Sequence, residues 1–173
     1  MIEIDTPEVI INVEEFILNN FNFRIQDLVK EKESTEYCAF RFTMNNNGVI
    51  FRKAKITPTK TGQFVTIWKR SEEGLTQAFE LTDHFEFLMI YVENENRSGI
   101  FIFPKNVLND QKILLNDFSA GKRGIRVYPS WNITNNRQAE KTQKWQLQYF
   151  IETTIGKNVK KIAKTCLTNM QSS

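Results

Sequence analysis

The sequence has few of the side chains that most often bind zinc or act as nucleophiles. It holds one histidine, His84, and two cysteines, Cys38 and Cys166. A structural zinc site takes four ligands, so these three residues cannot complete one without a carboxylate. A Ser–His–Asp triad would have to run through His84, and no nucleophile motif accompanies it. We expect the two cysteines, which are far apart in the chain, to be free thiols in a reducing cytoplasm.

The sequence also lacks glycine-rich loops and long apolar runs. It has 7 glycines and contains neither GxGxxG nor GxxxxGK[ST], the patterns that hold the phosphates of nucleotides. We therefore expect no cofactor. No run reaches the roughly 18 apolar residues of a membrane span, and the acidic start, M-I-E-I-D-T-P-E, lacks the basic region of a secretory signal. These absences predict a cytoplasmic protein with no membrane partner.

The composition that is present suits one packed domain. Hydrophobic residues make up 40% of the 173, and 14 of them are phenylalanines that can bury large areas. We predict a single α/β (α+β) domain with a mixed, mostly antiparallel central sheet flanked by helices. Within it we expect a helical region over residues 1–36, a sheet core over 37–152 and a basic helix or tail over 153–173.

Apolar spacing predicts a helix at each end of the chain. Near the N-terminus, Thr6 is placed to cap a helix and Pro7 suits its first turn. The apolar residues from Val9 to Phe21 then follow the period of a buried helical face. The polar segment Phe23–Glu36 suits a second helical piece or a loop. A lysine-rich helix is expected over Val159–Met170.

Strand patterns fill the middle of the sequence. Tyr37–Met44 alternates between polar and apolar residues, a turn follows at Asn45–Gly48, and residues 49–57 form the return strand of a hairpin. His84–Val92 is so continuously apolar that it suits a central strand. Further strands are expected at Gln63–Trp68, Ile100–Phe103 and Ile125–Tyr128, and further helices at Lys105–Leu108 and Arg137–Phe150.

Charge is segregated along the chain, although the net charge is only +3. Residues 1–40 and 71–96 carry −6 and −7, whereas residues 41–70, 97–144 and 145–173 carry +7, +6 and +3. Like charges concentrated in this way repel one another unless the fold spreads them or a polyanion meets them. The acidic and basic blocks could instead pair with each other, and this alternative stays open.

The stretch from Gly99 to Trp131 places cations beside aromatic rings at the ends of two expected strands. Lys105 follows the strand-ending Pro104, and glycines flank the pair Lys122-Arg123, which lets the chain approach a ligand closely. Nucleic-acid surfaces combine charge for the phosphates with flat rings for the bases. The rings interleaved with cations in this sequence belong to Trp68, Tyr128, Trp131 and Trp145.

Four segments form a pattern that is more specific than any single motif. They read A-K-I-T-P-T-K-T-G-Q-F-V-T-I-W-K-R (Ala54–Arg70), G-I-F-I-F-P-K-N-V-L (Gly99–Leu108), G-K-R-G-I-R-V-Y-P-S-W (Gly121–Trp131) and T-Q-K-W-Q (Thr142–Gln146). In this order and spacing the chain resembles the MepB family, small bacterial proteins named for a gene beside a multidrug efflux pump and its regulator.

The resemblance implies a mixed α/β scaffold related to restriction endonucleases and a role in nucleic-acid binding. Such scaffolds hold magnesium with an acid on one strand and a D/E-x-K on the next. Lys105 would be the lysine here, but Phe103 stands at the carboxylate position, and a phenyl ring cannot ligate a hard cation. The resemblance thus implies a nuclease-like frame with an incomplete metal site, and we expect no catalytic residue and no metal.

We predict a nucleic-acid-binding protein of low sequence specificity, because no recognition-helix motif is present. DNA and RNA both stay open, as does the oligomeric state. The predicted binding residues are Lys53, Lys55, Lys60, Trp68, Arg70, Lys105, Lys122, Arg123, Arg126, Tyr128 and Trp131.

Two alternatives come from other functional classes. One is a magnesium-dependent nuclease, which needs carboxylates beside Lys105. Their candidate sources are Asp83, Glu86, Glu93 and Glu95. The other is a protein-interaction or small-molecule-binding module whose charge blocks pair internally.

Overall fold

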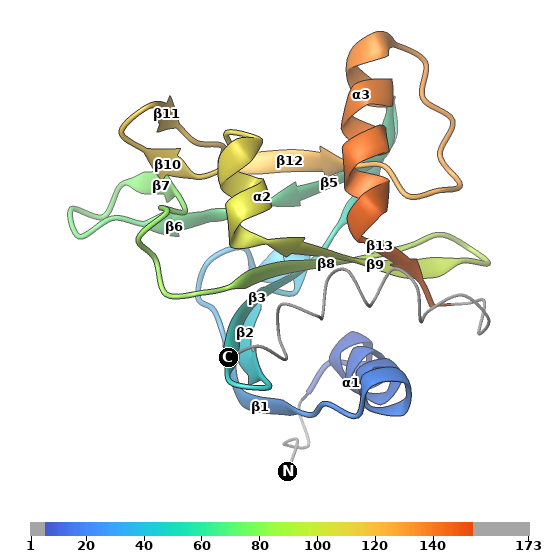
Figure 1. The fold of residues 1–173 in the computed structure, drawn as a ribbon, viewed down its shortest axis with the longest axis horizontal. Helices are drawn as coiled ribbons and strands as arrows, with labels where there is room; N and C mark the ends of the chain where they lie inside the picture. The colour runs from blue at the N-terminus through green and yellow to red at the C-terminus, as the bar shows by residue number, and fades with distance from the viewer. Residues whose placement is uncertain (1–5, 154–173) are drawn as a thin grey trace.

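A six-stranded sheet forms the centre of the computed structural model, which describes residues 6–153 (Figure 1). The sheet order is β1-β2-β3-β8-β9-β13, and only β3 and β8 are parallel neighbours among these strands. The predicted mixed, mostly antiparallel sheet is therefore confirmed. Its strands are β1 (Ile25–Lys30), β2 (Phe40–Met44), β3 (Asn47–Lys53), β8 (Phe87–Glu93), β9 (Ser98–Pro104) and β13 (Phe150–Glu152).

Helices cover both faces of this sheet. Helix α1 (Glu8–Phe21) lies on one face, and α2 (Lys105–Asp110) and α3 (Arg137–Gln146) stand on the other (Figure 1). The described residues thus form a single α+β domain. Two short 3₁₀ turns, η1 (Thr35–Tyr37) and η2 (Leu147–Tyr149), complete the helical elements.

Three smaller sheets lie on the α2–α3 side. The largest has the order β12-β5-β4, with β12 (Gly124–Val127), β5 (Lys60–Thr66) and β4 (Lys55–Thr57). Two hairpins join β6 (Trp68–Arg70) to β7 (Thr76–Ala78) and β10 (Leu115–Asn116) to β11 (Ser119–Ala120).

The strand β8 explains why the core has two halves. Leu88, Ile90 and Val92 pack into the cluster under α2 and α3, whereas Phe87 and Met89 pack into the cluster under α1. Because successive residues of a strand point to opposite faces, a strand that is covered on both faces must be apolar at every position. The continuous apolar run in the sequence is therefore that of a central strand, as predicted.

The prediction of a helical region over residues 1–36 is wrong for its second part, where Ile25–Lys30 forms the edge strand β1. Only Ile25 is buried in this strand. The pairing with β2 also shifts register between Gln26 and Val29, where Asp27 has φ 52°. An edge strand that is mostly exposed and interrupted by a bulge shows little alternation in its sequence.

Two local predictions also need correction. Residues 49–57 form two strands, because the chain leaves the central sheet at Ala54, whose N–H donates to the carbonyl of Tyr91, and β4 then joins another sheet. Lys53 and Lys55 therefore do not share the exposed face of one strand. At the start of α1, Pro7 is the N-cap and no side chain caps the helix, so Thr6 does not have the predicted role.

The C-terminal helix expected over Val159–Met170 lies outside the described residues, as does Cys166. Cys38 is a free cysteine, and burial raises the pKa of its thiol. Among residues 6–153, no helix is long and apolar enough to cross a membrane.

Candidate nucleic-acid interface

The small sheet β12-β5-β4 brings together cations from two distant parts of the sequence. Lys55 lies opposite Phe64, and Phe64 lies opposite Arg126. Residues opposite each other in antiparallel strands point to the same face. The next pair, Gln63 and Val127, is buried in the core. Lys55 and Arg126 therefore share the outer face of one sheet.

Two aromatic rings lie between these cations. The amine of Lys55 is 4.9 Å from the centre of the Tyr37 ring, and the guanidinium carbon of Arg126 is 5.9 Å from that of Phe64. The Tyr37 and Phe64 rings meet edge to face, with centres 6.1 Å apart. Burial and the nearby Glu36 carboxylate raise the pKa of Tyr37, so its hydroxyl is neutral near pH 7 and does not repel an anion.

Arg126 is held in place by the turn between β4 and β5. Its Nη1 donates to the carbonyl of Gly62 at 3.2 Å and contacts the carbonyls of Lys60 and Thr61 at 3.5 and 3.4 Å. Its Nη2 donates to Oγ1 of Thr57 at 2.8 Å. Arg126 thus keeps its positive charge on the surface, but most of its donors are used within the protein.

Ion pairs account for most of the cationic block 41–70, which holds 7 basic residues. Five of them pair with carboxylates within the described chain, namely Arg41 and Arg52 with Glu31, Lys53 with Glu93, Lys69 with Glu80 and Asp83, and Arg70 with Glu33. Lys55 and Lys60 have no carboxylate partner there. Much of the segregated charge is therefore neutralised internally, and the unpaired remainder lies on β4 and β5.

Unpaired cations also precede β12. Lys122 and Arg123 are exposed, and their side chains have no hydrogen-bond or ion-pair partner among residues 6–153. We call the exposed and half-buried side chains on the outer side of this sheet and its flanks the β4–β5–β12 surface. It consists of Tyr37, Lys55, Lys60, Phe64, Lys122, Arg123 and Arg126.

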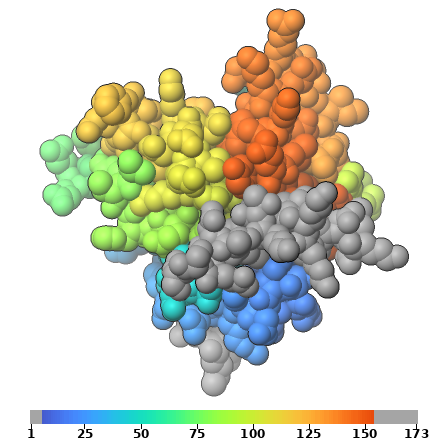
Figure 2. Space-filling model, viewed as in Figure 1, coloured from blue at the N-terminus to red at the C-terminus, as the bar shows by residue number. Residues whose placement is uncertain are grey.

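A groove of about 320 Å³ runs beside this surface, between β12, α3 and the segment that follows α2. We call it the β12 groove. Figure 2 shows the neighbouring surfaces of α2 in yellow and α3 in orange. Its polar, cationic and aromatic lining includes the side chains of Gln111, Lys122, Arg126, Tyr128, Gln138 and Trp145.

The buried Gln146 fixes α3 against β12 at the base of the groove. Its Nε2 donates to the carbonyl of Arg126 at 2.8 Å, and its Oε1 accepts from the N–H of Tyr128 at 2.9 Å. The side-chain amide of Gln146 thus makes the hydrogen bonds to the backbone of Arg126 and Tyr128 that a neighbouring strand would otherwise make at this edge of β12. Trp145 is held on its other side by Phe103, with ring centres 5.2 Å apart.

The structure does not bring all the predicted binding residues to this site. Lys53 is paired with Glu93 at the end of β3. Arg70 is paired with Glu33 at 2.7 Å, and its guanidinium carbon is 5.4 Å from the centre of the Trp68 ring. These three predicted residues therefore belong to the ends of β3 and β6 and do not line the β12 groove.

Trp131 and Lys105 also lie elsewhere. Trp131 packs edge to face on Phe150 at 5.7 Å and lies 5.0 Å from the guanidinium carbon of Arg97. The amine of Lys105 donates to the backbone carbonyl of Asp83 and lies 4.8 Å from the centre of the Phe85 ring. Both side chains have partners within the protein.

The acids proposed for a nuclease site have protein partners as well. The Asp83 carboxylate binds the amine of Lys69 at 2.6 Å, and that of Glu86 accepts from the N–H of Gly48 at 2.5 Å. Burial lowers the pKa of Lys69, but its hydrogen bonds to Asp83 and Glu80 outweigh this effect and raise it. Residues 6–153 contain no group of three His, Cys, Asp or Glu side chains that could hold a metal ion.

Two rings of the surface, Tyr37 and Phe64, were missed by the sequence analysis. In Q-F-V-T, Phe64 alternates with the buried Gln63 and Val65, so the period-2 pattern alone places it on the outer face. The alternating pattern predicts a strand over Tyr37–Met44, but Tyr37 lies in η1, before β2 begins.

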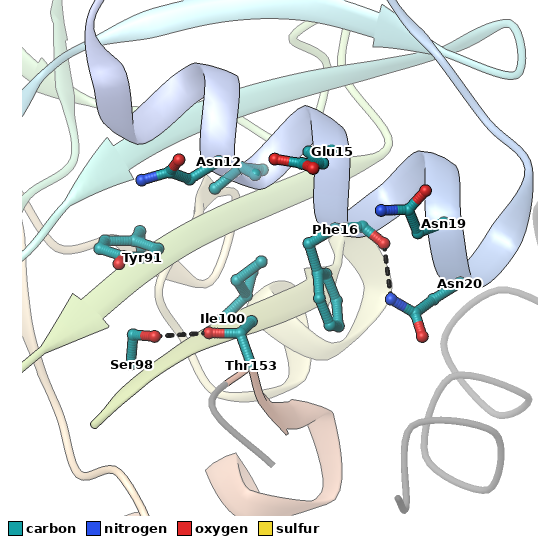
Figure 3. Close-up of a pocket in the computed structure, with 10 residues that line it drawn as sticks. Asn12, Glu15, Phe16, Asn19, Asn20, Tyr91, Ser98, Ile100 and Thr153 are labelled. Atoms are coloured by element: carbon teal, nitrogen blue, oxygen red, sulfur yellow. Dashed lines mark hydrogen bonds between the residues drawn. The ribbon is translucent and has the colours of Figure 1, made fainter. Parts of the chain in front are cut away.

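A second cavity, of about 340 Å³, lies between α1 and the strands β8 and β9 (Figure 3). Asn12, Glu15 and Asn19 of α1 line it, opposite Tyr91 and Ser98. Burial raises the pKa of the Tyr91 hydroxyl. The described residues that line this cavity include the carboxylate of Glu15 and no cation, so they do not favour a phosphate.

Comparisons with known proteins identify the family. A family model described as MepB-like matches residues 31–152. A solved structure described as "Crystal Structure of MepB" is 35% identical, with a TM-score of 0.75, and the match covers 86% of this chain and 99% of that one. Comparison with curated proteins found no match. The residues matched include the whole small sheet, α3 and the segment after α2 beside the β12 groove, and the chain belongs to the MepB-like family.

Proposed function

We propose that this protein binds nucleic acid with low sequence specificity through the β4–β5–β12 surface. One observation carries the proposal: Lys55 and Lys60 lie on one small sheet, Lys122 and Arg123 directly precede its strand β12, and all four lack carboxylate partners among the described residues. Phosphates pair with such cations, and the half-buried rings of Tyr37 and Phe64 give bases or sugars a partial aromatic surface to contact.

The scaffold is part of the same proposal. We place it among the nuclease-like frames that the family resemblance implies, used here for binding. Phe103 occupies the position where D/E-x-K enzymes have a carboxylate, two residues before Lys105. A protein of this kind would act in the cytoplasm on DNA or RNA without cleaving it.

The test is a salt titration of binding to a labelled oligonucleotide of mixed sequence, followed by fluorescence anisotropy. Four phosphate contacts predict that the logarithm of the association constant falls with the logarithm of salt concentration with a slope of about −3 for a single strand. An affinity that stays flat between low and moderate salt would exclude a binding mode led by phosphates.

A further inference from the structure

We infer that residues 154–173 of this chain dock in the cavity of about 340 Å³ between α1 and the strands β8 and β9, which is drawn in Figure 3. We call this cavity the α1 groove. The inference is independent of the proposed function, because the groove lies on the opposite face of the central sheet from the β4–β5–β12 surface. It depends on where the described chain ends, on the side chains of the groove and on the sequence of the segment.

The described chain ends in the wall of the α1 groove. Thr153 lines the groove, and its backbone N–H donates to the carbonyl of Ser98, another lining residue, at 2.9 Å. Twenty residues follow Thr153 in the sequence. The helix expected over Val159–Met170 would be about 18 Å long, against about 21 Å for the 14 residues of α1. The segment therefore starts at the groove and is long enough to run along α1.

The α1 groove has an apolar floor and a polar rim. Val13 and Ile100 line it and are buried, and the half-buried ring of Phe16 points from α1 towards β9 (Figure 3). Side-chain amides and one carboxylate form the rim on α1, and they belong to Asn12, Glu15, Asn19 and Asn20. An amphipathic helix fits such a groove, because its apolar face covers the floor while its polar face stays at the rim.

The sequence of the segment has the matching pattern. Its apolar residues recur at the spacing of one helical face, and they are Val159, Ile162, Ala163, Cys166, Leu167 and Met170. An isolated helix of about 12 residues is only marginally stable in water. Burial of this face against the rest of the protein would supply the missing stability, so the segment needs an apolar groove within its reach.

Charge favours the same location. Helix α1 carries three acidic residues and no basic one, whereas residues 154–173 carry no acidic residue and the four lysines Lys157, Lys160, Lys161 and Lys164. Glu15 lines the groove, is exposed, and has no ion-pair partner among residues 6–153. Docking would hold the four lysines on the α1 side of the sheet, so they would not add to the β4–β5–β12 surface.

Both partners of this contact lie outside the residues that the family model matches. The match covers residues 31–152, whereas α1 comes before this range and the segment comes after it. The docking is therefore inferred from this chain alone, from the groove and from the pattern of the segment.

The test is cross-linking of carboxylates directly to amines with a carbodiimide, applied to the full chain and read by mass spectrometry of the linked peptides. An equal mixture of unlabelled and ¹⁵N-labelled protein separates links within one chain from links between two copies. The variant Ile162→Asp, Leu167→Asp places two charges on the apolar face of the segment. The matched control, Thr165→Asp, Thr168→Asp, adds the same charges on the polar face of the same expected helix.

We expect links within one chain from Glu15 to the lysines of the segment, in the wild type and in the control variant. The variant with charges on the apolar face should give these links in about tenfold lower yield, because burying the aspartates is unfavourable. Absence of links between α1 and these lysines, or equal yields from the two variants, would overturn the inference. Links that join labelled to unlabelled chains would also overturn it and would identify a second copy as the occupant.

Discussion

Arg126 lies directly opposite Phe64 in the pairing of β12 with β5, and its guanidinium carbon is 5.9 Å from the centre of that ring. The same guanidinium donates to the turn that joins β4 to β5. One side chain therefore joins three strands whose cations come from two distant segments of the sequence. This makes Arg126 a structural element of the β4–β5–β12 surface as well as one of its charges.

Replacing Arg126 should cost stability, and replacing its neighbour should not. Arg126→Ala removes the hydrogen bonds of a charged donor and should lower the free energy of unfolding by about 2 kcal/mol. Arg123→Ala, at an exposed position without partners in the described chain, should change it by less than about 0.5 kcal/mol. Urea unfolding of the two variants measures both. Equal effects would show that the contacts of Arg126 are not structural.

Gly62 should not tolerate a side chain. It has φ +83°, and an added Cβ would lie 2.7 Å from a ring carbon of Tyr128. Gly62→Ala should therefore destabilise the protein by roughly 1–3 kcal/mol, through backbone strain and displacement of Tyr128. Gly74→Ala is the matched control, since Gly74 also has positive φ but nothing lies within 4 Å of its added Cβ. If both variants lowered the melting temperature equally, the contact with Tyr128 would not contribute to the loss of stability.

The double variant Lys122→Ala, Arg123→Ala should bind nucleic acid more weakly and with a smaller dependence on salt. Two lost phosphate contacts reduce the salt slope for a single strand by about 1.4. The control is Arg24→Ala, Lys30→Ala, which removes two exposed cations at the β1 edge. An equal loss of affinity in both variants would mean that net charge alone, and not the β4–β5–β12 surface, drives binding.

Removing one partner of the Glu31–Arg52 ion pair should lower the free energy of unfolding more than replacing both partners with apolar residues. Arg52 is fully buried, burial lowers the pKa of its guanidinium, and Glu31 also binds Arg41 at 2.6 Å. Glu31→Ala would leave a buried charge without its partner and should cost about 3–5 kcal/mol. The double variant Glu31→Leu, Arg52→Met should be more stable than Glu31→Ala in urea unfolding. If the double variant were no more stable than Glu31→Ala, the unpaired charge of Arg52 would not be the main cause of the loss.

Acid should weaken the link between β9 and β13. Both nitrogens Nε and Nη2 of Arg97 donate to Glu152, at 2.6 and 2.7 Å, and these bonds hold the pKa of Glu152 below its ordinary value of 4.5. A depressed pKa contributes stability above the unfolded-state pKa, and this contribution is lost as the pH falls through the folded-state pKa. The free energy of unfolding should therefore fall more steeply below pH 4.5 in the wild type than in Glu152→Gln. Parallel curves for the two proteins would contradict this.

The sequence predicted those elements whose local pattern agrees with their final environment. β8 is apolar at each of its first six positions because both of its faces are covered, and α1 has the period of a helix buried on one side. β1 was missed because an exposed edge strand obtains its hydrogen bonds from β2 without needing an apolar face. The last backbone bond from this segment to the central sheet joins Ala54 to Tyr91, which is far away in the chain, so the local sequence does not show where the pairing with β8 ends.

The candidate site was predictable only in part, for a related reason. Lys122 and Arg123 were recognisable beside glycines, and the structure leaves both exposed. The ion pairs of Lys53 and Arg70 could not be predicted from the sequence, because their partners Glu93 and Glu33 are distant in the chain and become neighbours only when the protein folds. The charge of each sequence block therefore predicts more unpaired cations than the fold contains. The register between strands determines which of the unpaired cations lie on the same face.

The most direct test of the account is a map of backbone amide shifts by NMR during titration with a single-stranded oligonucleotide of mixed sequence. We predict that the shifts concentrate in residues 55–66, 122–128 and 138–146, which hold most of the β4–β5–β12 surface and of the β12 groove. Shifts confined to α1 and the cavity beside it, or to the β6–β7 hairpin, would contradict the account.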